Sequence, residues 1–165
     1  MKAVYLNPFV ESVVSIMEHM LYETPMRGKA FVRTAVDSTD GDCIAIIIGV
    51  TGGLSGQVAL VLPKDCAKQI AAKLLREERM HEFDDIARSA LGEIANMITA
   101  HATIGLSDAG CVCDITPPTV IAGNSVAMKM PENIKTIVIP LQLSMGSIDL
   151  NVSLEEGFQR QDLMN

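Results

Sequence analysis

Glu93 and Asn96 are two side chains that could act together on a charged partner, and they stand three residues apart. A carboxylate accepts hydrogen bonds and pairs with a cation, whereas a neutral amide both donates and accepts. On a helix, residues three apart are neighbours on the surface, so both groups can reach the same external partner. The pair is therefore a candidate site that acts on something outside the chain.

A helix is predicted over residues 84–105, and it must position this pair. Asp84 and Asp85 suit the positive end of a helix, and Gly105 suits its stop. Glu93 and Asn96 fall on the side opposite an apolar stripe that must face the core. The stripe consists of Ala87, Ala90, Leu91, Ile94, Ala95, Ile98 and Ala102.

Small residues occupy the rest of the outward face, where a solvated helix usually carries long charged side chains. They are Ser89, Gly92, Ala100 and Thr103. Gly92 costs about 1 kcal/mol relative to Ala inside a helix, which predicts a packing or docking role. Spacing alone leaves open the alternative that Glu93 pairs with Arg88 or solvent and that Asn96 is an ordinary surface amide.

Charge and hydropathy argue against several classes of partner. Thirteen Lys and Arg against twenty Asp and Glu leave a net charge of -7, which repels nucleic acid and anionic membranes. No run of about 18 apolar residues occurs. The first residues also lack the pattern of a secretory signal. We expect no nucleic-acid partner, no membrane association and a cytoplasmic location.

The remaining elements predict a single α+β domain over residues 1–165, with long helices on a mainly antiparallel sheet. A first helix is expected from Asn7–Pro8 to near Thr24–Pro25, and a short one opens at Pro63 and Asp65. The turn formers at 38–42 predict a hairpin between the first two strands. Strands are expected at Lys29–Asp37, Cys43–Thr51, Gln57–Leu62, Gly110–Ile115, Ser125–Met130, Thr136–Leu143 and Ser147–Leu154.

A weak internal repeat accompanies this order of elements. Gly56–Leu62 has the same pattern as Gly146–Val152, and each copy would close a hairpin. Each half also opens with a long amphipathic helix. The pattern predicts two related helix-plus-strands units that share one sheet.

Other chemical signals favour structural roles. The turn at Thr51–Gly56 lacks the Lys-Ser or Lys-Thr ending of a phosphate-binding loop. Cys111 and Cys113 would share one strand face, but the histidines are distant, which disfavours zinc. We expect the four cysteines to be free and mostly buried, with no metal or cofactor bound by this chain.

Three separated motifs together resemble the CheX family of chemotaxis phosphatases. They are Ala90-Leu91-Gly92-Glu93-Ile94-Ala95-Asn96-Met97, Asp114-Ile115-Thr116-Pro117-Pro118-Thr119-Val120 and Ile48-Gly49-Val50-Thr51-Gly52-Gly53. The resemblance implies a CheC-like, pseudo-duplicated α+β fold. It also implies a phosphatase that removes phosphate from the aspartyl phosphate of a CheY-like response regulator in chemotaxis or two-component signalling.

In that family the Glu and Asn of the motif reach into the active site of the phosphorylated receiver, so the catalytic roles transfer to Glu93 and Asn96. Asn96 would hold the attacking water, while Glu93 would pair with the receiver's lysine. The expected Mg²⁺ belongs to the partner receiver domain. The resemblance further implies a homodimer joined through sheet edges.

Two points qualify this assignment. The related CheC type carries a second motif on its first long helix, but the corresponding residues here, Glu11-Ser12-Val13-Val14, end in a valine without an amide. A single site is therefore expected. The alternative function is a non-catalytic module that binds a phosphorylated receiver or a flagellar-switch partner on the same face.

Overall fold

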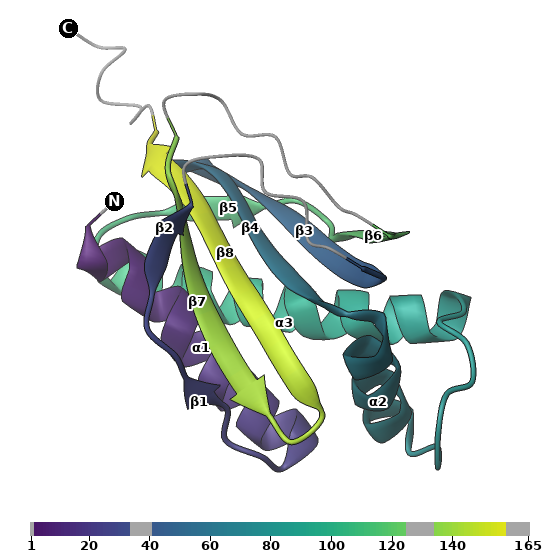
Figure 1. The fold of residues 1–165 in the computed structure, drawn as a ribbon. Helices are drawn as coiled ribbons and strands as arrows, with labels where there is room; N and C mark the ends of the chain where they lie inside the picture. Colours follow the sequence, from purple (N-terminus) through teal and green to yellow (C-terminus); the bar gives the residue numbers. More distant parts are fainter. Residues whose placement is uncertain (1, 34–40, 125–133, 158–165) are drawn as a thin grey trace, which may run out of the picture.

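Three helices lie on one face of an antiparallel sheet in the computed structural model, which describes residues 2–33, 41–124 and 134–157 (Figure 1). The helices are α1 (Ala3–Leu21), α2 (Lys64–Leu75) and α3 (Asp85–Asp108). The strands are β1 (Met26–Arg27), β2 (Phe31–Arg33), β3 (Cys43–Gly52), β4 (Leu54–Pro63), β5 (Cys113–Ile115), β6 (Thr119–Gly123), β7 (Thr136–Leu143) and β8 (Gly146–Glu156). The predicted α+β class, with long helices on a mainly antiparallel sheet, is confirmed.

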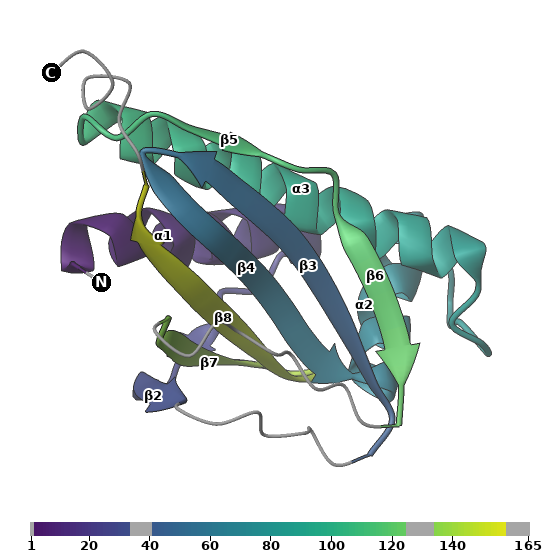
Figure 2. The same ribbon diagram turned by 90° about the horizontal axis from the view of Figure 1, so that it is seen from above.

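The order of strands is β1-β7-β8-β4-β3-β5, with β2 also beside β7 and β6 also beside β3. The central pair is β4 and β8, which run antiparallel from Leu54↔Glu156 to Val61↔Asp149. Figure 2 shows this sheet from above, with α1 and α3 crossing behind it. The chain thus places the two copies of the repeated pattern side by side at the centre of the sheet.

Two units of similar order make up this topology. One runs α1-β1-β2-β3-β4 and the other α3-β5-β6-β7-β8, while α2 lies between them in the chain. The hairpin of each unit is flanked by the short strands of the other, because β1 and β2 pair with β7, whereas β5 and β6 pair with β3. The arrangement matches the predicted duplication, and it interlocks the halves.

The hairpin predicted across residues 38–42 is wrong for the residues that the structure describes. Phe31–Arg33 pairs with β7, and Cys43–Gly52 pairs with β4, β5 and β6. The first strand therefore joins the other half of the sheet. Residues 34–37 of the predicted strand lie outside the described ranges.

The first helix begins earlier and ends earlier than the sequence predicts. It starts at Ala3, so that Pro8 is inside it, and it ends before Tyr22, whose φ is 53°. Apolar contacts of the residues before Pro8 with the core extend the helix upstream. An ion pair of 2.6 Å between Lys2 and Glu156 also ties this end to β8.

The helix that carries the site also ends later than predicted. Asp84 caps it as expected by accepting a hydrogen bond of 2.8 Å from the backbone N–H of Ala87. Gly105, the predicted stop, lies inside the helix, where an added Cβ would come 3.1 Å from Pro8 Cβ. This glycine serves the close crossing of α1 and α3, and the helix runs on to Asp108.

The later strands correct the prediction in two places. The strand predicted at Gly110–Ile115 is shorter, and the structure adds β6 at Thr119–Gly123, directly after the Thr-Pro-Pro bend. The predicted strand Ser125–Met130 lies outside the described residues. The strand at Thr136–Leu143 has the predicted bounds.

Candidate functional site on the outer face of α3

Glu93 and Asn96 lie on neighbouring turns of α3, on the side turned away from the sheet. Glu93 is exposed and Asn96 is half-buried, whereas Leu91, Ile94 and Ala95 between and beside them are buried. The buried stripe of this helix fixes its rotation on the sheet. The same packing therefore presents the carboxylate and the amide outward, as the sequence predicts.

The charge of Glu93 is left unpaired within the described part of the chain, where no ion pair involves it. Arg88, the cation that could have neutralised it, points elsewhere. Its guanidinium donates a hydrogen bond of 2.5 Å to the Val120 carbonyl and lies 5.9 Å from the centre of the Phe83 ring. The simplest alternative, a Glu93–Arg88 surface pair, is therefore wrong, and the carboxylate can pair with an external cation.

Gly92, which the sequence places on the outward face with a packing or docking role, has a packing role in the structure. It is buried, and a Cβ built on it would lie 3.6 Å from Pro118 Cγ and 3.7 Å from Val120 Cγ2. Gly92 therefore contacts β6 and the bend before it. Asn96 follows Gly92 by four residues, so it lies one turn further along α3, on the same side of the helix as this bend.

The Thr116–Pro118 bend is held at both ends. Thr116 Oγ1 accepts a hydrogen bond of 2.9 Å from the N–H of Gly49, and its own N–H donates to the Gly49 carbonyl at 2.9 Å. A Cβ on Gly49 would approach Thr116 Cγ2 to 2.9 Å, so glycine makes room for this contact. Together with the contact between Pro118 and Gly92, this joins all three sequence motifs into one connected region.

Sequence reasoning missed this connection. The stiffness of two successive prolines was visible in the sequence, because each fixes its own φ. Their neighbours on β3 and α3 were not, because these contacts join residues distant in the chain. The bend therefore packs on α3 at Gly92, one helical turn before Asn96.

Two hydroxyls of α3 near the pair are already used within the helix. Thr99 donates to the Ala95 carbonyl at 2.9 Å, and Thr103 donates to the Ala100 carbonyl at 2.7 Å. His101 is exposed, and its Nδ1 lies 2.9 Å from the buried hydroxyl of Ser12 on α1. The polar groups of Thr99, Thr103 and His101 therefore stabilise α3 and its packing, near the site.

The first helix presents a carboxylate but no amide at the corresponding positions. Glu11 is exposed and Val14 is half-buried. A valine side chain has neither a donor nor an acceptor, so it can hold no water. The predicted absence of a second motif on α1 is thus consistent with the residues that α1 presents.

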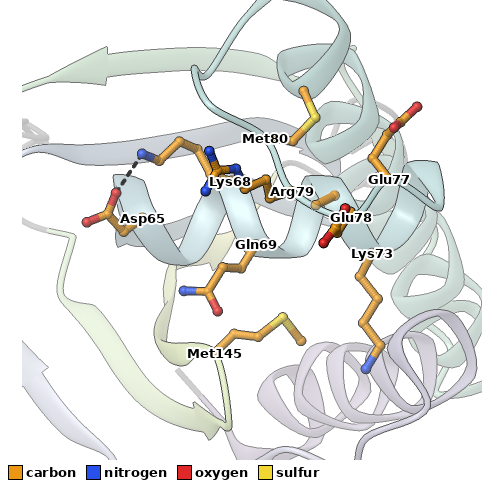
Figure 3. A pocket seen from close by; sticks show the side chains of 10 residues that line it. Asp65, Lys68, Gln69, Lys73, Glu77, Glu78, Arg79, Met80 and Met145 are labelled. Atoms are coloured by element: carbon orange, nitrogen blue, oxygen red, sulfur yellow. Dashed lines mark ion pairs between the residues drawn. The ribbon is translucent and has the colours of Figure 1, made fainter.

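A surface groove of about 540 Å³ lies elsewhere, along α2 and the segment after it (Figure 3). Its walls carry both signs of charge, and Lys68 is paired with Asp65 at 2.7 Å. The methionines Met80 and Met145 supply apolar contacts. No residue of α3 lines this groove, so it is separate from Glu93 and Asn96.

The cysteines are free, as predicted, and three of the four are buried. Burial raises the pKa of Cys66 to about 11, and burial together with Cys113 raises the pKa of Cys111 to about 11. The sulfurs of Cys111 and Cys113 lie 3.8 Å apart. Within the described ranges, no cluster of three or more His, Cys, Asp or Glu side chains could hold a metal ion.

Fold and site together define an α+β protein with helices on an antiparallel sheet, in which Glu93 and Asn96 stand together on the outer face of α3. The model of the family described as "Chemotaxis phosphatase CheX" matches residues 44–142. The chain belongs to the CheX family. The predicted family and the predicted enzyme class, a chemotaxis phosphatase, are confirmed.

Known proteins resemble this chain over nearly its whole length. The CheY-P phosphatase CheX of Thermotoga maritima is 26% identical over 160 residues, covering 95% of this chain and 99% of that protein. A CheX structure from Desulfovibrio desulfuricans has a TM-score of 0.82 at 24% identity, covering 92% of this chain and 99% of that one. The CheX–CheY–BeF3–Mg²⁺ complex from Borrelia burgdorferi has a TM-score of 0.76 at 28% identity, with coverage of 92% and 98%.

None of the helices in the described part of the chain combines the length and the apolar character needed to cross a bilayer.

Proposed function

We propose that this chain accelerates hydrolysis of the aspartyl phosphate on a CheY-like receiver domain, using Glu93 and Asn96. The observation that carries the proposal is the pairing of an exposed carboxylate, unpaired within the described chain, with an amide one turn away on α3. The relative from Thermotoga maritima is named a CheY-P phosphatase, and the Borrelia relative is in complex with CheY. Both support a receiver as the substrate.

The residue types suit this reaction. An aspartyl phosphate has a good leaving group, so catalysis needs mainly a water held in line with the phosphorus. The Asn96 amide would hold that water by donating to or accepting from it. The new P–O bond forms to water as the bond to the aspartate oxygen breaks, giving inorganic phosphate and a free carboxylate.

Glu93 would position the receiver. Its carboxylate would pair with the lysine of the receiver's active site, which fixes the orientation of α3 against the phosphoryl group. A Mg²⁺ ion bound by the receiver's own carboxylates would neutralise phosphoryl charge. The metal is then part of the substrate, and this chain supplies no metal ligand.

The decisive experiment follows the decay of a phosphorylated cognate receiver with and without this protein. Asn96→Ala should lower kcat about a hundredfold, because a misplaced reactant costs about that much, while receiver binding persists. Glu93→Gln should raise KM about tenfold through loss of a charge-assisted contact.

A matched control is Glu11→Gln, which removes the corresponding carboxylate on α1, where Val14 replaces the amide. Its decay rate should equal that of the wild type. Wild-type protein that leaves the decay rate unchanged would refute the proposal. If it binds the phosphorylated receiver tightly without accelerating decay, the chain is the non-catalytic binding module instead.

We also propose that this chain forms a homodimer through an edge of its sheet. We propose that it acts in the cytoplasm, in a two-component signalling pathway. The edge strands β1 and β2 expose three large apolar side chains, Met26, Phe31 and Val32. Unprotected edges with apolar side chains favour pairing with another strand. Sedimentation of wild type and Val32→Lys tests this, since a dimer at this edge should dissociate in the variant.

A further inference from the structure

The outer face of α3 extends beyond Glu93 and Asn96 in both directions, and each end carries an exposed isoleucine. Ile86 is 62% exposed and Ile104 is 61% exposed. Isolated exposed apolar residues are normal on proteins and need no explanation. These two differ, because their position on the helix relates them to the candidate site.

Both isoleucines lie on the same line along the helix as Glu93. At about 100° per residue, Ile86 is seven residues before Glu93 and Ile104 is eleven after, so each falls within about 20° of it. Between them, the residues nearest this line are mostly short: Ser89, Ala90, Asn96, Met97 and Ala100. The result is a narrow stripe with an apolar residue at each end.

Charge along this stripe is limited to Glu93 at its centre. The other charged residues of α3 are Asp85, Arg88 and Asp108. Arg88 is turned toward β6, and the two aspartates lie at the ends of the helix. One central anion flanked by neutral, short and apolar side chains complements a partner surface with a single cation surrounded by apolar atoms.

The length of the stripe matches a partner of domain size. Eighteen residues separate Ile86 from Ile104, which at about 1.5 Å per residue is about 27 Å, close to the diameter of a small domain. The two contacts would therefore fall near opposite rims of a docked receiver, with the reacting groups between them. Such placement restricts rocking of the helix against the phosphoryl group.

We propose that Ile86 and Ile104 are docking residues that seat the phosphorylated receiver along α3 and set its affinity. The inference rests on the proposed function, because the receiver is the occupant that Glu93 and Asn96 would engage. The isoleucines touch the partner's surface and not its reacting atoms. Their contribution therefore belongs to KM, whereas that of Asn96 belongs to kcat.

The test measures kcat and KM for dephosphorylation of the cognate receiver by Ile86→Gln and Ile104→Gln. Glutamine keeps a similar length and favours helix. Each variant should raise KM about tenfold, equivalent to about 1.4 kcal/mol, with kcat unchanged. A third variant, Ala100→Arg, places a long cation in the middle of the stripe and should raise KM about a hundredfold or more.

Ile121→Gln is the matched control. Ile121 is 40% exposed on β6, and its neighbour Val120 faces α3, so alternation along the strand turns Ile121 to the opposite face of the sheet. Its KM should equal that of the wild type. Thermal unfolding of all four variants separates lost docking from lost folding.

The outcomes distinguish this inference from the proposed function. Wild type without phosphatase activity refutes the proposed function. Active wild type with unchanged KM in both isoleucine variants and in Ala100→Arg refutes the docking role alone. If these variants leave KM unchanged but dissociate an oligomer in sedimentation, the stripe binds a second copy of this chain, which also overturns the inference.

Discussion

At the scale of single residues, Gly92 and Arg88 determine how the site is presented. Gly92 faces Pro118 and Val120 with room for a methyl group between them, and Arg88 is held by the Val120 carbonyl. Both residues therefore face β6, although the sequence pattern alone places them in solvent. Glu93 is left as the unpaired charge of the outer face among the described residues.

Gly92→Ala should stabilise the protein. The added Cβ would meet Pro118 and Val120 at 3.6 and 3.7 Å, which is ordinary van der Waals contact. Replacing glycine with alanine inside a helix gains about 0.5–1 kcal/mol. Urea unfolding should therefore show a higher free energy of unfolding, and phosphatase activity should stay within about twofold of the wild type.

A glycine at another position provides the contrast for this measurement. Gly56 has φ of +142°, and a Cβ there would lie 2.1 Å from the Ser153 carbonyl oxygen. Gly56→Ala should cost about 2–4 kcal/mol, because backbone strain and a clash both act on the central β4–β8 pair. Destabilisation by Gly92→Ala of similar size would contradict the packing described for α3.

At the scale of elements, α1 and α3 are joined along their crossing by two different contacts. Pro8 lies against Gly105, and Ser12 hydrogen-bonds His101 at 2.9 Å. His101 is only two turns beyond Glu93 on the same helix. The position of the helix that carries Glu93 and Asn96 thus depends partly on α1.

His101→Ala should destabilise the protein by about 1–2 kcal/mol, because it leaves the Ser12 hydroxyl buried without this partner. Ser12→Ala should cost less, since the exposed imidazole can then bond to water. The double variant should be more stable than the sum of the single effects predicts. Urea unfolding of all four proteins gives this coupling, and strictly additive values would contradict the hydrogen bond.

At the scale of the whole molecule, two interlocked units enclose one core. The hairpin β3–β4 and the hairpin β7–β8 meet at the β4–β8 pair, and short strands from each unit border the hairpin of the other. Neither half can complete its part of the sheet alone. Unfolding should accordingly be cooperative over the sheet and its helices.

Thiol labelling tests this cooperativity. The pKa of Cys66 is raised to about 11 by burial, so at pH 8 only about a thousandth of it is thiolate, and the fraction rises to one half at about pH 11. Reduced native protein should label first at the half-exposed Cys113. Cys66 should react slowly, and faster in urea as the molecule unfolds. Cys66 labelling at the rate of a free thiol in native buffer would contradict its burial.

The sequence by itself was sufficient to predict those features of the protein that depend on the local pattern of residues. The rotation of α3 follows from its apolar stripe, so the outward positions of Glu93 and Asn96 were predictable. The Thr136–Leu143 strand and both hairpins around β4 and β8 were predictable too, because alternating residues and adjacent turn formers specify them. The combination of three motifs was sufficient for the family.

Only the tertiary structure decided the features that join distant parts of the chain. The partner of Phe31–Arg33 is β7, more than a hundred residues away, and no local signal distinguishes it from the neighbouring β3. Gly105 looked like a helix stop because its role is to admit Pro8. Likewise the seating of Thr116 on Gly49 and of Pro118 on Gly92 is visible only once the chain is folded. Long-range contacts of this kind depend on the packing of the whole core, which a residue pattern does not encode locally.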